Sequence, residues 1–548
     1  MKRTILFFIF IAPLLLFATP KHEVRAVWLT TIGGIDWPDS YAHDGMGISR
    51  QQRQLTDMLD RLQSAGVNTV LLQTRVRATT IYPSDIEPWD GCLSGTPGKS
   101  PGYDALQFAI DECHKRGMEL HAWVVTIPIG KWNSYGCRQL RYRYGSLIRK
   151  IGDEGYMNPE SPLTASYLAD ICEEITRRYD VDGIHLDYIR YPETWRGHKS
   201  ASYITDIVKN ISIRVKSHKP WVKLSCSPIG KYEDLSRYSS RGWNARQTVA
   251  QDAQGWLRDG WMDQLYPMMY FAGNNFYPFA IDWMEQSHGR QVISGLGIYM
   301  LHPRERNWPL SEVERQLNVV RSIGMGHCYF RAKFLLDNVK GVYDFVKHFD
   351  RLPALAPPMT WAQSIAPSAP TRLNVAHTAI GDQLSWSGAK DNSDGPYLLY
   401  NIYASDQFPV DITKAENLIA IRHQGQQLTV PQREQHKERY YAVTAMDRYG
   451  NESTAVQEES EQTCFSASTL MPNDGYMLWV TQPTDAWQLE IVSMQGVVIS
   501  TRYKQAEVDI SNLPDGMYML KSRNTKGITH RMGFFIVKRH HDNRGATD

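Results

Sequence analysis

Eight short apolar runs alternate with amphipathic segments over the first two thirds of the chain, and this alternation constrains the fold most. The runs begin at Glu23, Asn68, Glu119, Asp182, Val222, Asp263, Gln291 and Gly326. The segments between them, such as SRQQRQLTDMLDRLQSAG from Ser49, end in the polar or glycine residues that stop helices. The pattern predicts an α/β fold, a closed parallel (β/α)8 TIM barrel. A doubly wound open sheet is the alternative, but no Gly-rich phosphate loop follows the first run.

The barrel pattern ends in a Pro- and Ala-rich stretch, RLPALAPPMTWAQSIAPSAP, which has the composition of a linker. We therefore expect the barrel over 22–362. Short strands with turn signals follow and predict two β-sandwich domains. The first, over 366–460, resembles a fibronectin type III sandwich with Trp386 and Tyr441 in its core.

The second sandwich is expected over 464–539. It resembles the small C-terminal domain of many secreted Bacteroidetes proteins, which in some of them is a sorting signal. A structural appendage with no sorting role is the alternative, because the tail HHDNRGATD runs past the usual end of that signal.

The N-terminal segment has the pattern of a secretory signal peptide. Lys2 and Arg3 precede an apolar stretch from Ile5 to Ala18, and small residues and Pro20 follow it. We expect residues 1–20 to be removed and the protein to be exported to the periplasm, the cell surface or the medium. An uncleaved anchor is the alternative, although the stretch is short for a membrane span, and the rest of the sequence offers no stable span.

Composition excludes some classes of partner. The net charge of +2 predicts neither nucleic-acid binding nor anionic-membrane binding. Sixteen tryptophans and twenty-nine tyrosines exceed the ordinary needs of a core. The seven cysteines show no CxxC pair, so we expect mostly buried, isolated thiols and no metal site.

The stretch VDGIHLDYIRYP, from Val181 to Pro192, carries the densest group of chemically active side chains. If it is the fourth barrel strand, His185 and Asp187 share the inward face, because strand side chains alternate. Asp187 then falls last, at the carboxyl rim where barrel enzymes keep their chemistry. A structural ion pair with Arg190 is the alternative for this carboxylate.

The strand ends also carry a family resemblance. VRAVWLTTIGGIDWP, TTIYPSDIEPWDGCLSGTPGKSPGYDAL, VDGIHLDYIRYP, SPIG and AQDAQGWLRDGWMDQLYPMMYF occur in the order typical of the glycosyl hydrolase-like family 10 of bacterial envelopes, which residues 22 to 362 resemble. The resemblance implies a barrel hydrolase of glycans, with peptidoglycan as a substrate class. The chain departs from the family pattern at Thr79, Thr80, Val125, Tyr188 and Met268.

Glycoside hydrolysis ordinarily needs two carboxyl groups that flank the bond. We expect Asp187 to be one of them, as nucleophile or stabiliser of the transition state. Glu305 and Glu87 are the leading choices for the second, ahead of Asp36 and Glu193, and each has a solvated loop carboxylate as its alternative. Asp263 enters the sixth strand at the other end and is expected to be structural.

Other rim residues are expected to bind sugar rings, hydroxyls or carboxylates. These predicted substrate-binding residues are Asp36, Trp37, Arg75, Tyr82, Trp89, His121, Trp123, His185, Tyr188, Arg190, Tyr191 and Tyr270. Some aromatic and histidine side chains are expected to fill the core instead. We predict no metal and no cofactor.

The leading hypothesis is an exported glycoside hydrolase that acts on peptidoglycan or a related amino-sugar polysaccharide. A hydrolase of host or dietary polysaccharide is one alternative. The other is a non-catalytic glycan-binding envelope protein, which the missing carboxylates at Thr79 and Tyr188 favour.

Overall fold

The computed structural model describes residues 19–378, 380–431, 439–457, 470–480, 486–494, 497–503, 507–524 and 529–539. Most of the predicted signal peptide and Cys464 lie outside these residues. The chain divides into two compact units, 1–457 and 458–548.

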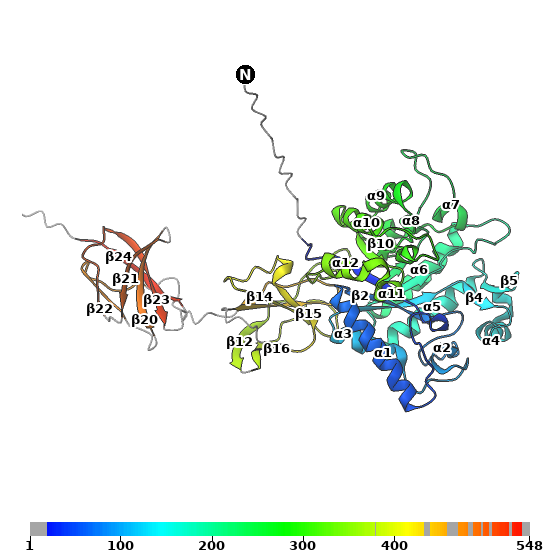
Figure 1. Ribbon diagram of the computed structural model, residues 1–548, viewed down its shortest axis with the longest axis horizontal. Helices are drawn as coiled ribbons and strands as arrows, with labels where there is room; N and C mark the ends of the chain where they lie inside the picture. Colours follow the sequence, from blue (N-terminus) through cyan, green and yellow to red (C-terminus); the bar gives the residue numbers. More distant parts are fainter. Residues whose placement is uncertain are drawn as a thin grey trace, which may run out of the picture. The chain divides into compact units, whose positions relative to one another are not determined.

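The first unit contains a closed barrel of eight parallel strands, which confirms the predicted fold class (Figure 1). The strands are β1 (Arg25–Leu29), β2 (Thr69–Arg75), β3 (Glu119–Val125), β7 (Gly183–Asp187), β8 (Lys223–Cys226), β9 (Gln264–Leu265), β10 (Gln291–Leu296) and β11 (Gly326–Tyr329). They pair in the order β1-β11-β10-β9-β8-β7-β3-β2, and β2 closes on β1. Each begins at or within three residues of a predicted apolar run.

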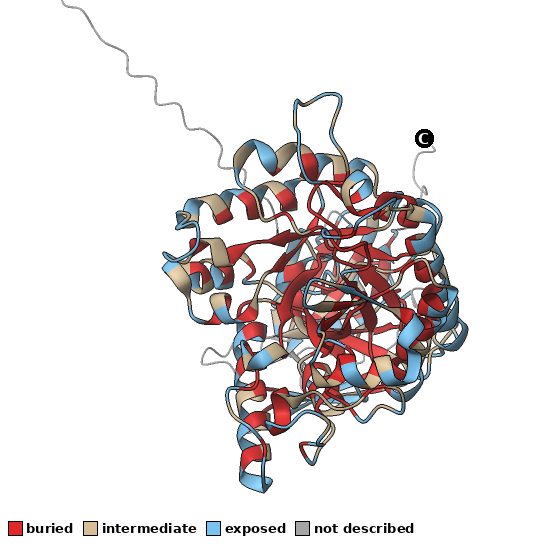
Figure 2. Cartoon of the chain, turned by 90° about the vertical axis from the view of Figure 1, so that its right-hand side faces the viewer, coloured by how far each residue is buried: buried red, intermediate tan, exposed pale blue. Residues whose placement is uncertain are grey.

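Helices surround these strands, with buried inner faces and exposed outer faces (Figure 2). They are α1 (Gly45–Ser64), α2 (Gly91–Ser94), α3 (Ala105–Lys115), α5 (Pro162–Arg178), α6 (Ala201–His218), α7 (Ala245–Val249), α8 (Ala253–Arg258), α9 (Tyr277–Glu285), α10 (Leu310–Ser322), α11 (Ala332–Leu336) and α12 (Val342–Phe349). The helix α5 illustrates the local cause: Pro162 occupies its first turn, and Leu168, Ile171 and Ile175 recur on its buried face.

Side chains fill the barrel interior, so the barrel is a packed core and not a pore. Trp28, His185 and Tyr266 form edge-to-face aromatic pairs there. The Nε1 group of Trp28 donates to Nε2 of His185 at 3.2 Å, and Nδ1 of His185 lies 2.9 Å from the Ser225 hydroxyl. Burial lowers the pKa of His185 well below its usual value, so this imidazole is neutral.

Six cysteines of the described residues are buried and unpaired. They are Cys92, Cys113, Cys137, Cys172, Cys226 and Cys328.

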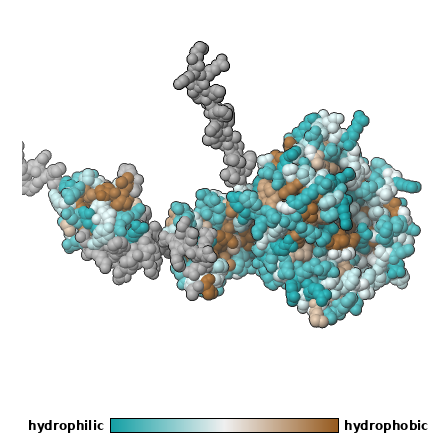
Figure 3. Space-filling model, viewed as in Figure 1, coloured by the Kyte–Doolittle hydropathy of each residue, from teal (hydrophilic) through white to brown (hydrophobic). Residues whose placement is uncertain are grey.

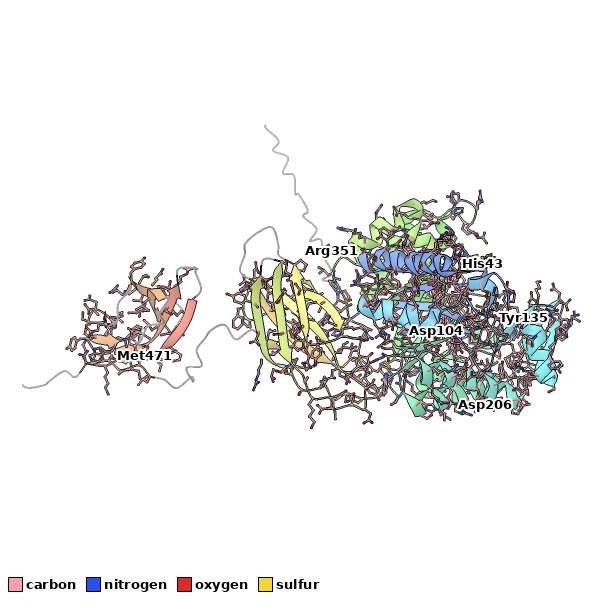
Figure 4. All side chains as sticks on the ribbon, turned by 90° about the horizontal axis from the view of Figure 1, so that it is seen from below. His43, Asp104, Tyr135, Asp206, Arg351 and Met471 are labelled. Atoms are coloured by element: carbon pink, nitrogen blue, oxygen red, sulfur yellow. The ribbon has the colours of Figure 1, made fainter. Side chains whose placement is uncertain are left out.

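A small excursion follows the carboxyl end of β3. It comprises β4 (Pro128–Lys131), α4 (Tyr135–Tyr144), β5 (Ile148–Ile151) and β6 (Glu154–Met157), and its strands form an antiparallel sheet in the order β4-β6-β5. Tyr135, labelled in Figure 4, begins α4. The excursion lies at the carboxyl rim because it connects β3 to α5.

A seven-stranded β-sandwich completes the first unit. One sheet contains β12 (Thr371–Thr378), β13 (Gly381–Ser387) and β16 (Gln427–Pro431), and the other contains β14 (Leu399–Ser405), β15 (Leu418–His423), β17 (Tyr440–Met446) and β18 (Val456–Gln457). Trp386 and Tyr441 are buried in its core. The resemblance to fibronectin type III stays a prediction.

Buried ion pairs join this sandwich to the amino-terminal end of the barrel. Arg422 donates to Asp182 at 2.5 Å and to Glu119 at 3.1 Å, and Arg448 donates to Asp182 at 3.1 Å. Lys223 on β8 also pairs with Glu119, at 2.8 Å. Asp182 and Glu119 stand at the starts of barrel strands, so the sandwich covers the end opposite the carboxyl rim.

The second unit is a separate β structure. Its strands are β19 (Met477–Trp479), β20 (Ala486–Ser493), β21 (Val498–Tyr503), β22 (Glu507–Asp509), β23 (Gly516–Asn524) and β24 (Thr529–Val537). They form a β21-β20-β23-β24 sheet and a β19-β22 pair around a core that includes Leu478, Leu520 and Phe535. Among the described residues of the whole chain, no helix is long and apolar enough to span a membrane.

Candidate active site

Asp187 ends β7 at the carboxyl rim and is held by neutral donors. Its Oδ1 accepts hydrogen bonds from the Ser227 hydroxyl at 2.7 Å and the Tyr188 backbone N–H at 2.8 Å. Its Oδ2 accepts from Trp123 Nε1 at 3.1 Å. The Asp187 carbonyl accepts the backbone and hydroxyl donors of Thr126, at 2.9 and 2.8 Å. The carboxylate is therefore fixed in position, yet it remains 7% exposed.

Burial raises the pKa of Asp187 above its ordinary value. The bonds from Ser227, Tyr188 and Trp123 and the charge of Arg190 oppose this shift, because each favours the carboxylate anion. The effect of burial is larger. The neighbours of Asp187 thus only partly offset the loss of water around its charged form.

The residue after Asp187 adopts a backbone conformation that is rare for a large side chain. Tyr188 has φ of 54°, in the left-handed region, and its ring is 41% exposed. The Arg190 guanidinium lies 4.8 Å from the Tyr188 ring and 5.5 Å from the Trp243 ring. Such strain costs about 1–3 kcal/mol and concentrates at functional sites. Tyr188, Arg190 and Trp243 form one aromatic and cationic wall beside Asp187.

A second aromatic wall comes from the loops after β9, β10 and β11. Tyr270 stacks on Phe330 with ring centroids 5.2 Å apart, and Tyr299 meets Tyr270 edge to face at 5.7 Å. Burial, aided by the charge of Asp187, raises the pKa of Tyr270 well above its usual value. The charge of Asp187 acts on Tyr270, so this wall lies near the carboxylate.

The other predicted carboxylates differ in their freedom to react. Glu87 is buried in a bidentate pair with Arg75, at 2.6 and 2.8 Å, and also accepts from the Tyr167 hydroxyl at 2.9 Å. Both of its oxygens are thus occupied. The Arg75 guanidinium also donates to the Thr126 carbonyl at 3.0 Å, so this pair braces the base of the β3 loop.

Asp36 is similarly engaged. It accepts from the Thr30 backbone and hydroxyl at 2.9 and 2.7 Å, from the Lys333 N–H at 3.1 Å and from Arg331. These bonds tie the β1 loop to the β11 loop.

Glu193 and Glu305 are the more accessible carboxylates. Glu193 pairs with Arg190 at 2.7 Å, and its side chain is 49% exposed. Glu305 is exposed in the loop after β10, and within the described residues it has no ion pair. Its charge contributes to the raised pKa of Tyr299, which places it beside the second aromatic wall.

Several predicted binding residues do not reach the rim. His185 lies inside the barrel, and His121 lies 3.2 Å from Glu119 toward the amino-terminal end. Trp37 and Tyr82 are fully buried, where Trp37 donates to the Gln51 carbonyl and Tyr82 donates to Glu174. Tyr191 is also fully buried, against Trp195. These five side chains fill the core in this structure, and Trp89 packs partly buried against it.

The structure adds rim residues that the sequence did not point to. They are Ser227, Trp243, Tyr299 and Phe330. A usable signal existed for Ser227, because it directly follows β8. Trp243 and Tyr299 lie far along long loops, where strand periodicity gives no guidance.

One buried group has ligand atoms close enough to suit a metal, but its charges do not. Glu23, His327 and Asp350 lie together at the amino-terminal end of the barrel. Arg321 pairs with both carboxylates, at 2.6 and 2.5 Å, and Arg25 pairs with Glu23 at 2.7 Å. Two arginines already neutralise these acids, so the cluster does not fit a cation.

A cavity of about 890 Å³ also lies away from Asp187. It is lined by both the barrel's amino-terminal end and the sandwich, including His114, Arg351, Tyr397 and Ile421.

A TIM barrel with a fixed rim carboxylate between two aromatic walls has the architecture of a glycoside hydrolase. Comparison with known families agrees: the Glycosyl hydrolase-like 10 model matches residues 23–200 and 190–300. The chain belongs to this family, and it is a glycoside hydrolase. Residues 472–537 match the Secretion system C-terminal sorting domain, which confirms the predicted kinship of the last domain.

Related proteins share much of this length. Glycosyl hydrolase YngK of Bacillus subtilis (strain 168) is 27% identical over 501 residues, which cover 83% of this chain and 96% of that protein. Glycosyl hydrolase DigH of Escherichia coli (strain K12) is 32% identical over 290 residues, which cover 46% of this chain and 66% of that protein. Among solved structures, an alpha-amylase from Geobacillus thermoleovorans in complex with acarbose matches with a TM-score of 0.38 and 12% identity, over 78% of this chain and 99% of that chain.

Proposed function

We propose that the protein is exported and hydrolyses glycosidic bonds in peptidoglycan glycan strands or a related amino-sugar polysaccharide. The observation that carries the proposal is the position of Asp187, a buried carboxylate at the rim between two aromatic walls. The sorting-domain match of residues 472–537 and the apolar N-terminal segment support export.

Asp187 acts in this proposal as nucleophile or as stabiliser of the positive charge that develops on the sugar. The two carboxyl oxygens of Asp187 accept three hydrogen bonds, and neither oxygen donates one in the described residues. This is the arrangement that a carboxylate anion requires. Glu305 is the proposed acid, because it is exposed and its charge acts on Tyr299 of the second aromatic wall. Glu193 is the second choice, since its pairing with Arg190 lowers its pKa and favours the carboxylate form, which has no proton to donate.

The walls supply the binding surface. Tyr270, Tyr299 and Phe330 offer apolar faces for sugar rings, and Tyr188 offers another across the mouth. Arg190 lies beside Asp187 and has an Nε group with no partner among the described residues, so it is a proposed ligand for a hydroxyl or a lactyl carboxylate.

A glycan-binding protein without catalysis is the second candidate. The closed pairs of Glu87 and Asp36 favour it, because they leave few carboxylates free to act with Asp187. A hydrolase of host or dietary polysaccharide differs from the main proposal only in substrate.

The test is the release of soluble fragments from purified peptidoglycan, with and without stem peptides. Asp187→Ala should abolish release without loss of folding, and Asp234→Ala, an exposed carboxylate after β8, is the matched control. Comparison of Glu305→Gln with Glu193→Gln then identifies the acid. Glycan binding without release by the unmodified chain would contradict hydrolysis of this substrate and favour the binding protein.

A further inference from the structure

The excursion after β3 carries a concentration of positive charge that the net charge of +2 conceals. Arg138 and Arg141 lie three residues apart on α4 and therefore share a face, and Tyr142 adjoins them. Lys150 on β5 lies 5.4 Å from the Trp132 ring, and the Arg141 guanidinium lies 3.9 Å from the same ring. We call Arg138, Arg141, Tyr142 and Lys150 the basic face. Figure 3 shows mostly hydrophilic surface at this end of the barrel unit.

The cations of the basic face form no close ion pairs within the described part of the chain, although the charge of Lys150 contributes to the lowered pKa of exposed Asp153. The acids of the excursion pair elsewhere: Asp153 and Glu154 with Lys131, at 2.8 and 2.9 Å, and Glu160 with Arg149 at 3.5 Å. No ion pair within 4.0 Å forms at any cation of the basic face among the described residues. The positive charge therefore remains available to a ligand.

The basic face also has a fixed cation and an open aromatic ring. Arg141 is held by the Trp132 ring and by a 2.9 Å bond to the Trp132 carbonyl. The Tyr142 ring is 91% exposed, which is more than any other large hydrophobic side chain of the described residues. A large ring without a packing role beside a pre-positioned guanidinium suits a ligand with both flat apolar faces and negative charges.

The excursion packs closely on the loop after β2 at the rim. A Cβ atom at Gly136 would lie 2.6 Å from the Ala78 carbonyl oxygen, so only glycine lets α4 approach the β2 loop this closely. The Arg77 side chain lies over Gly130 of β4, and its charge acts on both Tyr156 of β6 and Tyr188 of the mouth. The excursion that carries the basic face thus packs on the same rim of the barrel as Asp187.

We propose that the basic face is a secondary binding surface for an anionic polysaccharide, which holds a strand whose reacting bond lies at Asp187. The placement of the reacting bond at Asp187 rests on the proposed hydrolase function. The charge suits a polyanion, and the place of the excursion on the Asp187 rim and the exposed Tyr142 ring favour a glycan over a membrane surface or a nucleic acid.

The test measures binding in an Asp187→Asn background, which keeps the ligand intact. The probes are stem-free peptidoglycan strands, the same strands with their carboxyl groups reduced to alcohols, polygalacturonate, and vesicles of anionic phospholipid. The variants are Arg138→Gln with Lys150→Gln, and Tyr142→Ala alone. Lys347→Gln with Lys390→Gln is the matched control, because it removes two exposed cations outside the excursion.

The double variant should weaken binding of native strands and polygalacturonate roughly tenfold at low ionic strength, and less as salt screens the charges. Reduced strands should bind equally to the double variant and the control, while Tyr142→Ala should weaken binding of both kinds of strand. Unchanged affinity of the double variant for both anionic glycans would overturn the inference. The inference would also be overturned if the double variant lost affinity for the phospholipid vesicles but for neither glycan.

Hydrolysis is measured separately, on fragments too short to reach the excursion. The double variant should cleave them at the unmodified rate. Binding that depends on the basic face, in a chain that cleaves no glycan, would support the surface and contradict only the proposed hydrolysis.

Discussion

Both ends of the barrel hold buried carboxylates, but the pKa values of these carboxylates are shifted in opposite directions. At the amino-terminal end, the cations Lys223 and Arg422 lower the pKa values of Glu119 and Asp182, although burial alone would raise them. At the carboxyl end, burial of Asp187 outweighs its neutral hydrogen-bond donors and the charge of Arg190, so its pKa is raised. At Glu119 and Asp182, neighbouring cations more than offset the effect of burial, as suits carboxylates that join two parts of the fold. At Asp187 the effect of burial is only partly offset, as suits a carboxylate that takes part in a reaction.

Exchange of a carboxylate for an amide at each end should separate the two roles. Asp187→Asn should reduce glycan hydrolysis at least about a thousandfold, which corresponds to about 4 kcal/mol of transition-state stabilisation, because the anion is lost. Asp182→Asn should lower the free energy of unfolding but leave the rate per folded molecule unchanged. Fragment release measures the activity of both variants, and urea unfolding measures their stability. Equal losses of activity in Asp187→Asn and Asp182→Asn would contradict the comparison.

Removal of a cation from the amino-terminal end should destabilise the fold. Arg422→Ala leaves buried Asp182 and Glu119 with fewer partners, and we expect a loss of about 3 kcal/mol in the free energy of unfolding. Lys414→Ala, at an exposed pair with Glu416, is the control and should cost less than about 0.5 kcal/mol. A similar small loss in both variants would show that the buried pairs do not stabilise the joint.

Acid should lower the free energy of unfolding through the buried carboxylates at the amino-terminal end of the barrel. The folded-state pKa values of Glu119 and Asp182 are lowered, so near pH 4 the unfolded chain binds protons that the folded chain does not. Their stabilisation is full above about pH 5 and is lost as the pH falls toward the lowered values, by up to about 1.4 kcal/mol per pH unit for each group.

Urea unfolding between neutral and acid pH measures this dependence. Arg422→Ala should flatten it, whereas Glu416→Gln on the sandwich surface should not. A dependence that Arg422→Ala leaves unchanged would assign the acid sensitivity to other carboxylates.

The smallest predicted effect is at the rim. The Ser227 hydroxyl lowers the pKa of Asp187, so Ser227→Ala should raise that pKa and move the acid limb of the activity profile upward by about half a pH unit. The direction follows because the anion is the active form. The pH dependence of fragment release measures the shift, and Ser225→Ala, inside the barrel, is the control. A shift toward lower pH would favour a protonated Asp187 as the active form.

Strand periodicity was enough to predict the barrel and the rim position of Asp187. Each apolar run is continuous because both faces of a barrel strand are buried. The same reasoning could not find β4, β5 and β6, since four-residue strands with exposed cations such as Lys150 lack an apolar run.

The ion pairs and hydrogen bonds of the other carboxylates could not be predicted from the sequence either. Glu87 looked available because its partners, Arg75 and Tyr167, come from different elements, and only the folded chain brings all three together. Arg422 and Asp182 are 240 positions apart, and no local pattern links them. The burial of aromatics such as Tyr82 could not be foreseen for a related reason, because residue type alone does not separate a side chain of the barrel core from one that stacks on a sugar.

The six buried cysteines have a consequence for the lifetime of the folded chain. Burial raises the pKa of each thiol, which suppresses the reactive thiolate. In an oxidising compartment, opening of the chain exposes these thiols together, and any mismatched disulfide that then forms blocks refolding. The durability of the protein there is then governed by how slowly the barrel opens, and not by the equilibrium between folded and unfolded chains.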